Sequence, residues 1–290
     1  MHDNLIILAG GMSSRMKKNS TSNSLSKEEE IQANERSKSL ISVGNNGRPL
    51  LDYLLFNAKK AGYKNIYIVI NEKATLFKEL YGQKKENNPF HGLSISFAIQ
   101  YIPENREKPF GTADAVFQTV EQFPELNHQQ YTICNSDNLY SEKSLKILRE
   151  TQNKNAFISY DRDALHFSTD KILGFAVMNL DSQNYLKSII EKPSEAIANN
   201  HKDSLGKIRV SMNIFKFDGE NMFSYLKNCP VNPERNEKEL PTAVLNCVKD
   251  DARAFLGIPI SEHVPDLTSK EDISIIKEYL KNHYPENLNW

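Results

Sequence analysis

The sequence predicts an α/β protein in which a mixed, mostly parallel central sheet is flanked by helices, with a smaller antiparallel portion. Apolar runs alternate with helical segments over the first two thirds of the 290 residues, which is typical of parallel strands joined by crossover helices. The earliest run is apolar at every position, as in strands that are covered on both faces. Later strand-like runs follow one another with little helix between them, which indicates antiparallel pairing.

The predicted strands of the parallel part are short runs rich in β-forming residues. They cover Leu5–Ala9, Asn65–Ile70, Leu93–Tyr101 and Tyr131–Asn135. One helix is predicted from Pro49 to Ala61, with Gly62 as its C-cap, and another from Thr112 to Phe123, stopped by Pro124. The antiparallel portion is predicted from Lys171–Leu180, Tyr185–Ile190 and Lys207–Phe217, and a last helix from residues 269–282.

Composition and charge narrow the class of function. The net charge is −1, from 36 basic and 37 acidic residues, so no overall field attracts nucleic acid or an anionic membrane. The three cysteines, Cys134, Cys229 and Cys247, lie far apart, so we expect reduced thiols rather than a zinc site or disulfides. We expect no signal peptide and no membrane span, and therefore a cytoplasmic protein. The length allows one large α/β domain or two small ones, and we expect a single domain over residues 1–290.

Residues 17–37 interrupt this pattern with an almost wholly polar stretch rich in Ser, Asn and Glu. Such a composition predicts a flexible polar loop on the surface. The stretch also lies between a basic turn and Lys38, where a lid could close over reacting phosphates. The sequence leaves both readings open.

The start of the chain joins a buried strand to a turn suited to phosphate. The residues concerned are Leu8, Ala9, Gly10, Gly11, Ser13, Ser14 and Arg15. The glycines carry no Cβ, so their backbone can turn sharply and bring N–H groups against a ligand. The serines and the arginine supply hydroxyl donors and a guanidinium for phosphate oxygens. The string is neither a Walker loop nor a dinucleotide fingerprint. A nucleotide phosphate cradle and a plain tight turn both fit it.

Later segments carry side chains suited to the same chemistry, and each has a plainer reading. Lys38 precedes an apolar run and is either a phosphate-binding cation or a solvated surface charge. Gly111-Thr-Ala-Asp-Ala115 opens a predicted helix, where small residues let a base or ribose approach the backbone, although Thr112 also reads as a plain N-cap. Asp137 follows a predicted strand, where its carboxylate suits a hard divalent cation or caps the next helix.

Two further segments complete the set. Glu191 and Lys192 follow the predicted strand that ends at Ile190, and Lys192 is available for a second phosphate. Asp266 precedes the last predicted helix and is either a cation ligand or a turn residue. No single segment is specific, so the order of all of them carries the interpretation.

In this order the segments resemble the sugar-1-phosphate nucleotidyltransferases, or nucleoside-diphospho-sugar pyrophosphorylases. The string from Leu8 to Met16 resembles their L-x-G-G-x-G-[ST]-R-[LM] signature, with Ser13 in place of the third glycine. Four other strings resemble the family's Pro-Lys, G-T-A-x-A, E-K-P and D-x-G-T-x-E-D motifs; they are Ser37-Lys38, Gly111–Ala115, Glu191–Pro193 and Asp266–Asp272. Family members that read a pyrimidine use a glutamine shortly before the G-T-A string. Residues 103–110 contain none, so the base preference stays open.

The resemblance implies a Rossmann-like nucleotide-diphospho-sugar transferase fold whose antiparallel portion binds the sugar. It implies transfer of a nucleotidyl group from an NTP to a sugar-1-phosphate, with release of pyrophosphate. The catalytic residues would be Arg15, Lys38, Asp137 and Lys192, and Asp137 and Asp266 would hold Mg²⁺. The nucleotide would bind Leu8, Ala9, Gly10, Gly11, Ser13, Ser14, Gly111, Thr112 and Asp114. The sugar phosphate would bind Gly174, Glu191, Lys192 and Asn213.

Two other functions stay open on the sequence alone. The same cradle suits a nucleotidyltransferase for a non-sugar acceptor such as phosphocholine. The fold also suits a non-catalytic sugar-nucleotide sensor, although binding alone would not require both metal carboxylates. The expected partners are an NTP and a phosphorylated acceptor, with neither nucleic acid nor membrane, and a homo-oligomer stays open.

Overall fold

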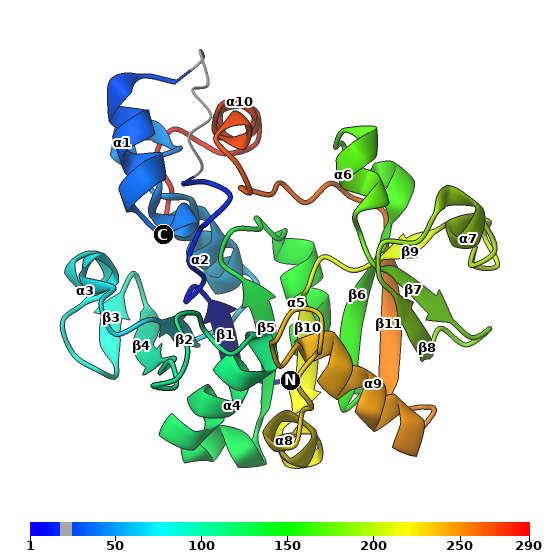
Figure 1. Cartoon of the computed structure of the whole chain (residues 1–290). Helices are drawn as coiled ribbons and strands as arrows, with labels where there is room; N and C mark the ends of the chain where they lie inside the picture. The colour runs from blue at the N-terminus through cyan, green and yellow to red at the C-terminus, as the bar shows by residue number, and fades with distance from the viewer. Residues whose placement is uncertain (18–24) are drawn as a thin grey trace.

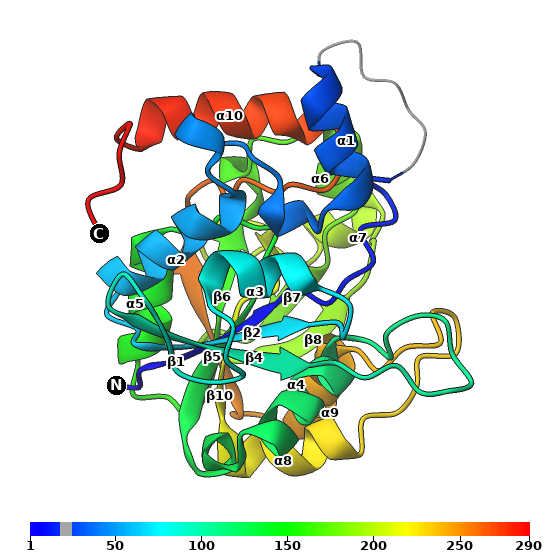
Figure 2. The same cartoon turned by 90° about the vertical axis from the view of Figure 1, so that its left-hand side faces the viewer.

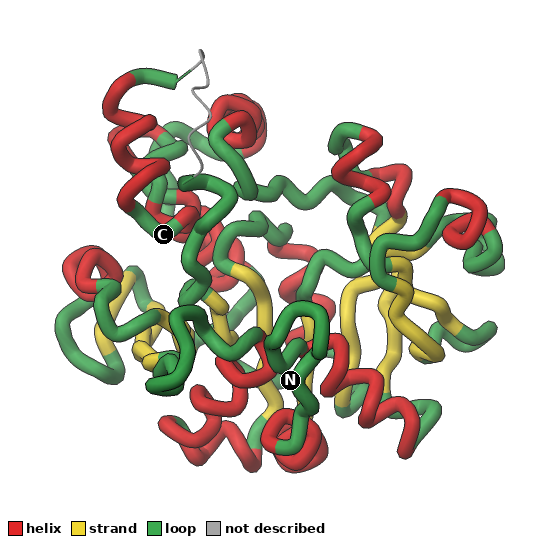
Figure 3. The backbone as a smooth tube through the Cα atoms, in the orientation of Figure 1, coloured by secondary structure: helices red, strands yellow, loops and turns green. Residues whose placement is uncertain are grey.

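The computed structural model describes residues 1–17 and 25–290, which form one eleven-stranded sheet with helices on both faces (Figure 1 and Figure 3). The strand order is β3-β4-β2-β1-β5-β10-β6-β9-β7-β8, and β11 pairs with β6 off this path. The strands are β1 Asn4–Leu8, β2 Asn65–Ile70, β3 Asn88–Phe90, β4 Leu93–Ile99, β5 Gln130–Asn135, β6 Asn155–Asp161, β7 Val177–Leu180, β8 Leu186–Ile190, β9 Arg209–Val210, β10 Phe215–Asp218 and β11 Phe255–Ile260.

The helices alternate with these strands along most of the chain. They are α1 Lys27–Glu35, α2 Leu50–Lys60, α3 Thr75–Tyr81, α4 Thr112–Gln122, α5 Glu142–Glu150, α6 Thr169–Leu173, α7 Glu195–Asn199, α8 Gly219–Lys227, α9 Leu240–Asp250 and α10 Glu271–His283. In residues 1–17 and 25–290, no helix combines the length and the apolar character that crossing a lipid bilayer requires. The predicted α/β class with a mixed sheet is confirmed.

The centre of the sheet is parallel, as predicted. β1 pairs in parallel with β2 and with β5, and β2 pairs in parallel with β4. The carboxyl ends of parallel strands meet at one edge of a sheet, so the turns after Leu8, Ile70, Ile99 and Asn135 lie near one another. Ligands of open α/β sheets bind at this edge, and the candidate site is built there.

Successive side chains of β1 point to opposite faces of the sheet, and each face has its own core. Leu5 and Ile7 belong to the cluster that includes apolar residues of α2, α5 and α10. Ile6 belongs to the cluster that includes apolar residues of α4, α8 and α9. All three side chains are fully buried. The all-apolar run at the start of the sequence is therefore a strand covered on both faces.

The antiparallel portion exists, but two of its predicted strands are wrong in extent. β10 lies antiparallel between β5 and β6, and β7 pairs antiparallel with β8 and with β9. Residues 169–173, partly within the predicted strand 171–180, form helix α6 instead, and β7 begins only at Val177. The predicted strand 207–217 is interrupted between Val210 and Phe215, with Asn213 at a φ of 55°. These interruptions matter, because residues of both segments line the candidate site.

The polar stretch at 17–37 is also not a plain loop. Residues 18–24 lie outside the described residues, but Lys27–Glu35 forms helix α1. Ser26 and Glu29 form a capping box, in which each side chain accepts a hydrogen bond from the other residue's backbone N–H. Glu29 also forms an ion pair with Lys277 of α10, beside which α1 lies in Figure 2. The stretch is thus helical in part, and the hypothesis that it closes as a lid stays a prediction.

Candidate functional site

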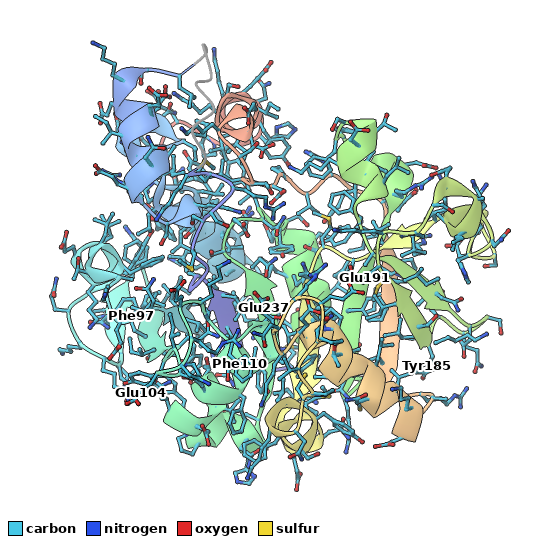
Figure 4. All side chains as sticks on the ribbon, in the orientation of Figure 1. Phe97, Glu104, Phe110, Tyr185, Glu191 and Glu237 are labelled. Atoms are coloured by element: carbon cyan, nitrogen blue, oxygen red, sulfur yellow. The ribbon has the colours of Figure 1, made fainter. Side chains whose placement is uncertain are left out.

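Two cavities open at the carboxyl edge of the parallel strands, with volumes of about 410 and 720 Å³. They share part of their walls, because Thr112, Asn135, Asp137 and Glu237 line both. Figure 4 labels Glu237 over the middle of the sheet and Glu191 nearer β6 and β9. The cavities are therefore two adjoining spaces that meet around Asp137.

The predicted site residues divide between these two spaces. The smaller cavity is lined by Leu8, Ala9, Gly10, Gly11, Ser13, Ser14, Lys38, Gly111, Thr112 and Asp137. The larger is lined by Arg15, Thr112, Asp137, Gly174, Glu191, Lys192, Asn213 and Asp266. Asp114 lines neither, and Arg15 lies on the side predicted for the sugar phosphate. The structure thus brings together residues from distant segments and keeps the two predicted groups largely apart.

The turn after β1 has little room on one side and open space on the other. A Cβ on Gly10 would lie 3.1 Å from Gln100 Oε1, whereas a Cβ on Gly11 would meet no atom within 4 Å. Ser13 has a φ of 55°, the left-handed conformation that glycine adopts most readily. Ser13, which stands at the position of the family's third glycine, therefore has a backbone conformation that glycine also permits.

The turn before α4 requires glycine at position 111. Gly111 has a φ of 105°, and a Cβ there would lie 2.3 Å from Lys238 O. Backbone N–H groups of Ala113 and Leu240 donate to Lys238 O at 2.9 Å and to Thr112 Oγ1 at 3.0 Å. The N-cap residue of α4 is Gly111, so the reading of Thr112 as a plain N-cap is wrong. Its hydroxyl instead fastens the segment 238–240 beside the cavities.

Buried Gln100 lines the smaller cavity, although it is not one of the predicted site residues. Its Nε2 donates to Gly111 O at 3.0 Å and to Asp114 Oδ2 at 3.1 Å. Asp114 also accepts a hydrogen bond of 2.8 Å from Gln118 Nε2. Asp114 does not line the cavity, but it helps to position Gln100, which does. Gln100 lies directly after β4 and before residues 103–110, the stretch in which the resemblance would place the family's pyrimidine-reading glutamine.

Lys38 and Asp137 form an ion pair inside the site. Lys38 Nζ lies 2.8 Å from Asp137 Oδ2, and the two side chains are only 12% and 23% exposed. Lys38 is therefore not a solvated surface charge. Asp137 does not cap α5 either, because Ser141 Oγ accepts the hydrogen bond from Ser144 N at the start of that helix.

Asp266 lies next to Asp137 because their two segments pair. Asn138 forms an antiparallel bridge with Asp266, and Leu267 N donates to Asp137 O at 2.8 Å. Burial raises the pKa of the Asp266 carboxyl, and the Asp137 charge raises it further. The N-cap position of α10 is Lys270, so Asp266 is not the cap of that helix. The pairing therefore brings two acidic residues from distant parts of the chain close enough for their charges to interact.

Two carboxylates near a cavity suited to phosphate match the protein ligands that Mg²⁺ commonly uses at phosphate-transfer sites. Within the described residues, no three His, Cys, Asp or Glu side chains converge as a metal cluster. Mg²⁺ keeps several waters and is usually held by one or two carboxylates together with substrate phosphates, not by an all-protein cage. Asp137 and Asp266 both line the larger cavity and could supply two such carboxylates.

The larger cavity carries two residues with unusual backbone conformations. Lys192 has a φ of 43° and Asn213 a φ of 55°, both in the left-handed region. Such conformations in non-glycine residues cluster at ligand-binding turns. Arg235 lies between two glutamates. Its Nη2 is 3.8 Å from Glu191 Oε2, and its Nη1 is 2.7 Å from Glu239 Oε1. This side of the site therefore combines cations and carboxylates on turns outside the parallel strands.

Several lining residues were missed besides Gln100. They are Lys108, Lys171, Arg235 and Glu237, which line one or both cavities. Each lies in a segment without a recognised motif, and single lysines or glutamates in polar stretches resemble ordinary surface residues. Nothing local in the sequence distinguishes them, since only the folding of distant segments brings them to the cavities.

Residues 5–256 match the family model described as nucleotidyl transferase. The chain is 24% identical over 287 residues to the glucose-1-phosphate adenylyltransferase of Rhodopseudomonas palustris strain HaA2, covering 96% of this chain and 63% of that protein. It is 25% identical over 236 residues to the protein of that name from Bradyrhizobium diazoefficiens, covering 79% and 51%. A third, from Clostridioides difficile strain 630, is 20% identical over 264 residues, covering 90% and 62%.

The chain thus spans between about half and two thirds of the length of these relatives. The mixed sheet agrees with the fold that the resemblance implied. Since the family model covers most of its length, the chain belongs to the nucleotidyl transferase family.

Proposed function

We propose that this protein transfers a nucleotidyl group from an NTP to a sugar-1-phosphate, which forms an NDP-sugar and releases pyrophosphate. The observation that carries the proposal is the pair of adjoining cavities that meet at Asp137. One cavity has the glycine turn suited to a nucleotide, and the other has the cationic turns suited to a phosphorylated acceptor. The similar proteins are named glucose-1-phosphate adenylyltransferases, so ATP and glucose-1-phosphate are the first substrates to test.

The reaction needs no general base. A phosphate monoester carries a charge of about −1.5 to −2 at neutral pH, so its oxygen is already an anionic nucleophile. The obstacle is electrostatic, because this oxygen must approach an α-phosphorus surrounded by other negative oxygens. Catalysis therefore consists of neutralising charge and holding the two phosphates in line. The site supplies cations and carboxylates for both tasks.

Each candidate residue has a proposed task in the reaction. Lys38 would balance charge on the triphosphate in the smaller cavity. Arg15 would hold the departing pyrophosphate, a task that rests on the family resemblance, since Arg15 itself lines the larger cavity. Lys192 would orient the sugar phosphate, and Glu191 and Gly174 would contact the sugar.

Asp137 and Asp266 would hold the Mg²⁺ ion. When bound, the ion would neutralise phosphate charge and polarise phosphoryl oxygens. Asp137 lines both cavities, so its carboxylate lies where the two substrates would meet.

The test is pyrophosphate release from each NTP with a panel of phosphorylated acceptors. We expect release with sugar-1-phosphates, and with an Asp137→Asn control we expect none. Release with phosphocholine alone would replace the sugar by a non-sugar acceptor. Tight binding of nucleotide sugars without release by any pair would identify a sensor and overturn the proposal.

A further inference from the structure

Lys171 is a cation of the larger cavity to which the proposed reaction assigns no task. It lies in the last turn of α6, and its Nζ is 2.9 Å from Asp266 Oδ2 and 3.2 Å from Asp272 Oδ1. The same Nζ lies 4.5 Å from the centre of the Phe167 ring, which is close enough for a cation–π contact. The ammonium group is therefore held by three partners.

The oxygen that Lys171 contacts, Asp266 Oδ2, has a second hydrogen-bond partner and belongs to a poorly solvated side chain. Asp266 Oδ2 also accepts a hydrogen bond of 2.5 Å from Thr268 Oγ1, and the Asp266 side chain is 11% exposed. Asp137 lies beside Asp266 and is paired in the same manner with Lys38. Charges placed together in a poorly solvated site require opposite charges nearby. Each of the two carboxylates is thus neutralised by its own lysine.

A divalent cation that binds Asp266 Oδ2 would compete with the ammonium group of Lys171 for that oxygen, because Thr268 Oγ1 already donates a hydrogen bond to it as well. A metal bound at Asp266 would also lie close to the Lys171 charge and be repelled by it. Asp272 gives Lys171 a second carboxylate, which stays with the lysine because Asp272 uses its other oxygen to accept hydrogen bonds from Thr268 N and Ser269 N. Lys171 therefore has a place to remain after it leaves Asp266.

We propose that Lys171 is the counter-ion of Asp266 that a divalent metal must displace, so that Lys171 weakens metal binding to the free protein. This inference rests on the metal role of Asp266 in the proposed function. It predicts that free metal binds the protein weakly, and that the phosphates of a substrate are needed to recruit it. Lys171 lines the larger cavity, so its ammonium group, once released from Asp266, would be available to the phosphorylated acceptor.

The test is a titration of the purified full chain with Mn²⁺ alone, with free Mn²⁺ followed by electron paramagnetic resonance. We expect Lys171→Met to bind Mn²⁺ about tenfold more tightly than the wild type, because the competing charge is removed while the side-chain length is kept. Lys171→Gln serves as a second neutral variant with the same expected gain, and Lys171→Arg, which keeps the charge, should bind like the wild type. Lys192→Met is the matched control, since it removes a cation from the same cavity without touching either aspartate.

The outcomes separate this inference from the proposed function. If Asp266→Asn loses Mn²⁺ binding but both neutral Lys171 variants bind like the wild type or more weakly, Lys171 is only a structural tether and the inference fails alone. An equal gain in Lys192→Met would also overturn it, because general cavity charge would then explain the effect. If Asp266→Asn binds Mn²⁺ as the wild type does, the metal role of Asp266 fails, and the inference fails with it.

Discussion

The two cavities of the site are built from different kinds of structure. The smaller one includes residues at the carboxyl ends of parallel strands or directly after them, such as Leu8, Val69, Gln100 and Asn135. The larger one is walled mainly by turns and short elements from distant segments, such as Lys171 in α6 and Asp266 before α10. The smaller cavity, the proposed nucleotide side, is thus built mainly on turns that follow parallel strands, whereas the larger cavity, the proposed acceptor side, depends more on how distant segments pack.

The largest loss of activity should come from a substitution of Asp137, which lines both cavities. We expect Asp137→Asn to lower turnover by about 10³-fold or more, because it removes the carboxylate at which the two cavities meet. The melting temperature should stay close to that of the wild type. Pyrophosphate release measures the first and a thermal melt the second. Asp170→Asn, on the wall of the larger cavity alone, is the control and should lose little. Near-normal turnover in Asp137→Asn would remove Asp137 from the metal role.

The nucleotide side can be tested with two glycines that differ in their surroundings. We expect Gly111→Ala to destabilise the fold by about 3 kcal/mol, since its φ is positive and its Cβ would meet Lys238 O at 2.3 Å. Gly11→Ala should melt like the wild type, because no atom lies within 4 Å of its Cβ. It should instead weaken NTP binding about tenfold, since the methyl group enters the cavity. Denaturant titration and calorimetry measure these effects. Equal stability of the two variants would show that the segment 238–240 gives way easily.

The acceptor side should respond through substrate affinity, not through stability. We expect Lys192→Met to lower kcat/KM for the phosphorylated acceptor by about 10²-fold. The dissociation constant of the NTP should not change, because Lys192 lines only the larger cavity. Steady-state kinetics with each substrate varied in turn gives both quantities. A comparable loss in NTP binding would mean that the two cavities do not act as separate substrate sites.

The smallest predicted effect is a loss of folding stability in acid, which we attribute to His263 near α10. Burial, with the charges of His166, Lys171 and His283, lowers the pKa of His263 to about 4 from 6.5. A histidine with a lowered pKa in the folded state contributes stability above the unfolded pKa and loses it as the pH falls. The unfolding free energy should therefore drop by about 2 kcal/mol between pH 6.5 and pH 4 on this account.

His263→Asn tests this loss, because asparagine can still accept the hydrogen bond that His166 N donates to His263 Nδ1. Denaturant titrations at pH 7 and pH 4.5 should show a smaller acid loss in the variant than in the wild type. Some loss of stability in acid should remain in the variant, since burial also lowers the pKa of His2, just before β1, to about 3. An identical loss in both proteins would assign acid sensitivity to other groups.

The parts of the site that follow from the sequence are those set by neighbouring residues. The apolar run 5–9 predicts β1, and the two glycines after it predict the turn, because strand burial and backbone freedom are local properties. The G-T-A-x-A string likewise predicts the start of α4. Between residues 171 and 176 the same reasoning is wrong, since the end of the short helix α6 and the turn after it replace the predicted strand beside the larger cavity.

What the sequence determined by itself was the class of fold, the glycine turns and the identity of the charged residues in the family motifs. Only the tertiary structure decided which of those charges meet. The pairing of Asn138 with Asp266 places two carboxylates together, and α6 brings Lys171 onto one of them. The physical reason is that a turn depends on the residues beside it. An ion pair between positions 171 and 266 depends on how two distant segments pack, and no local pattern records that.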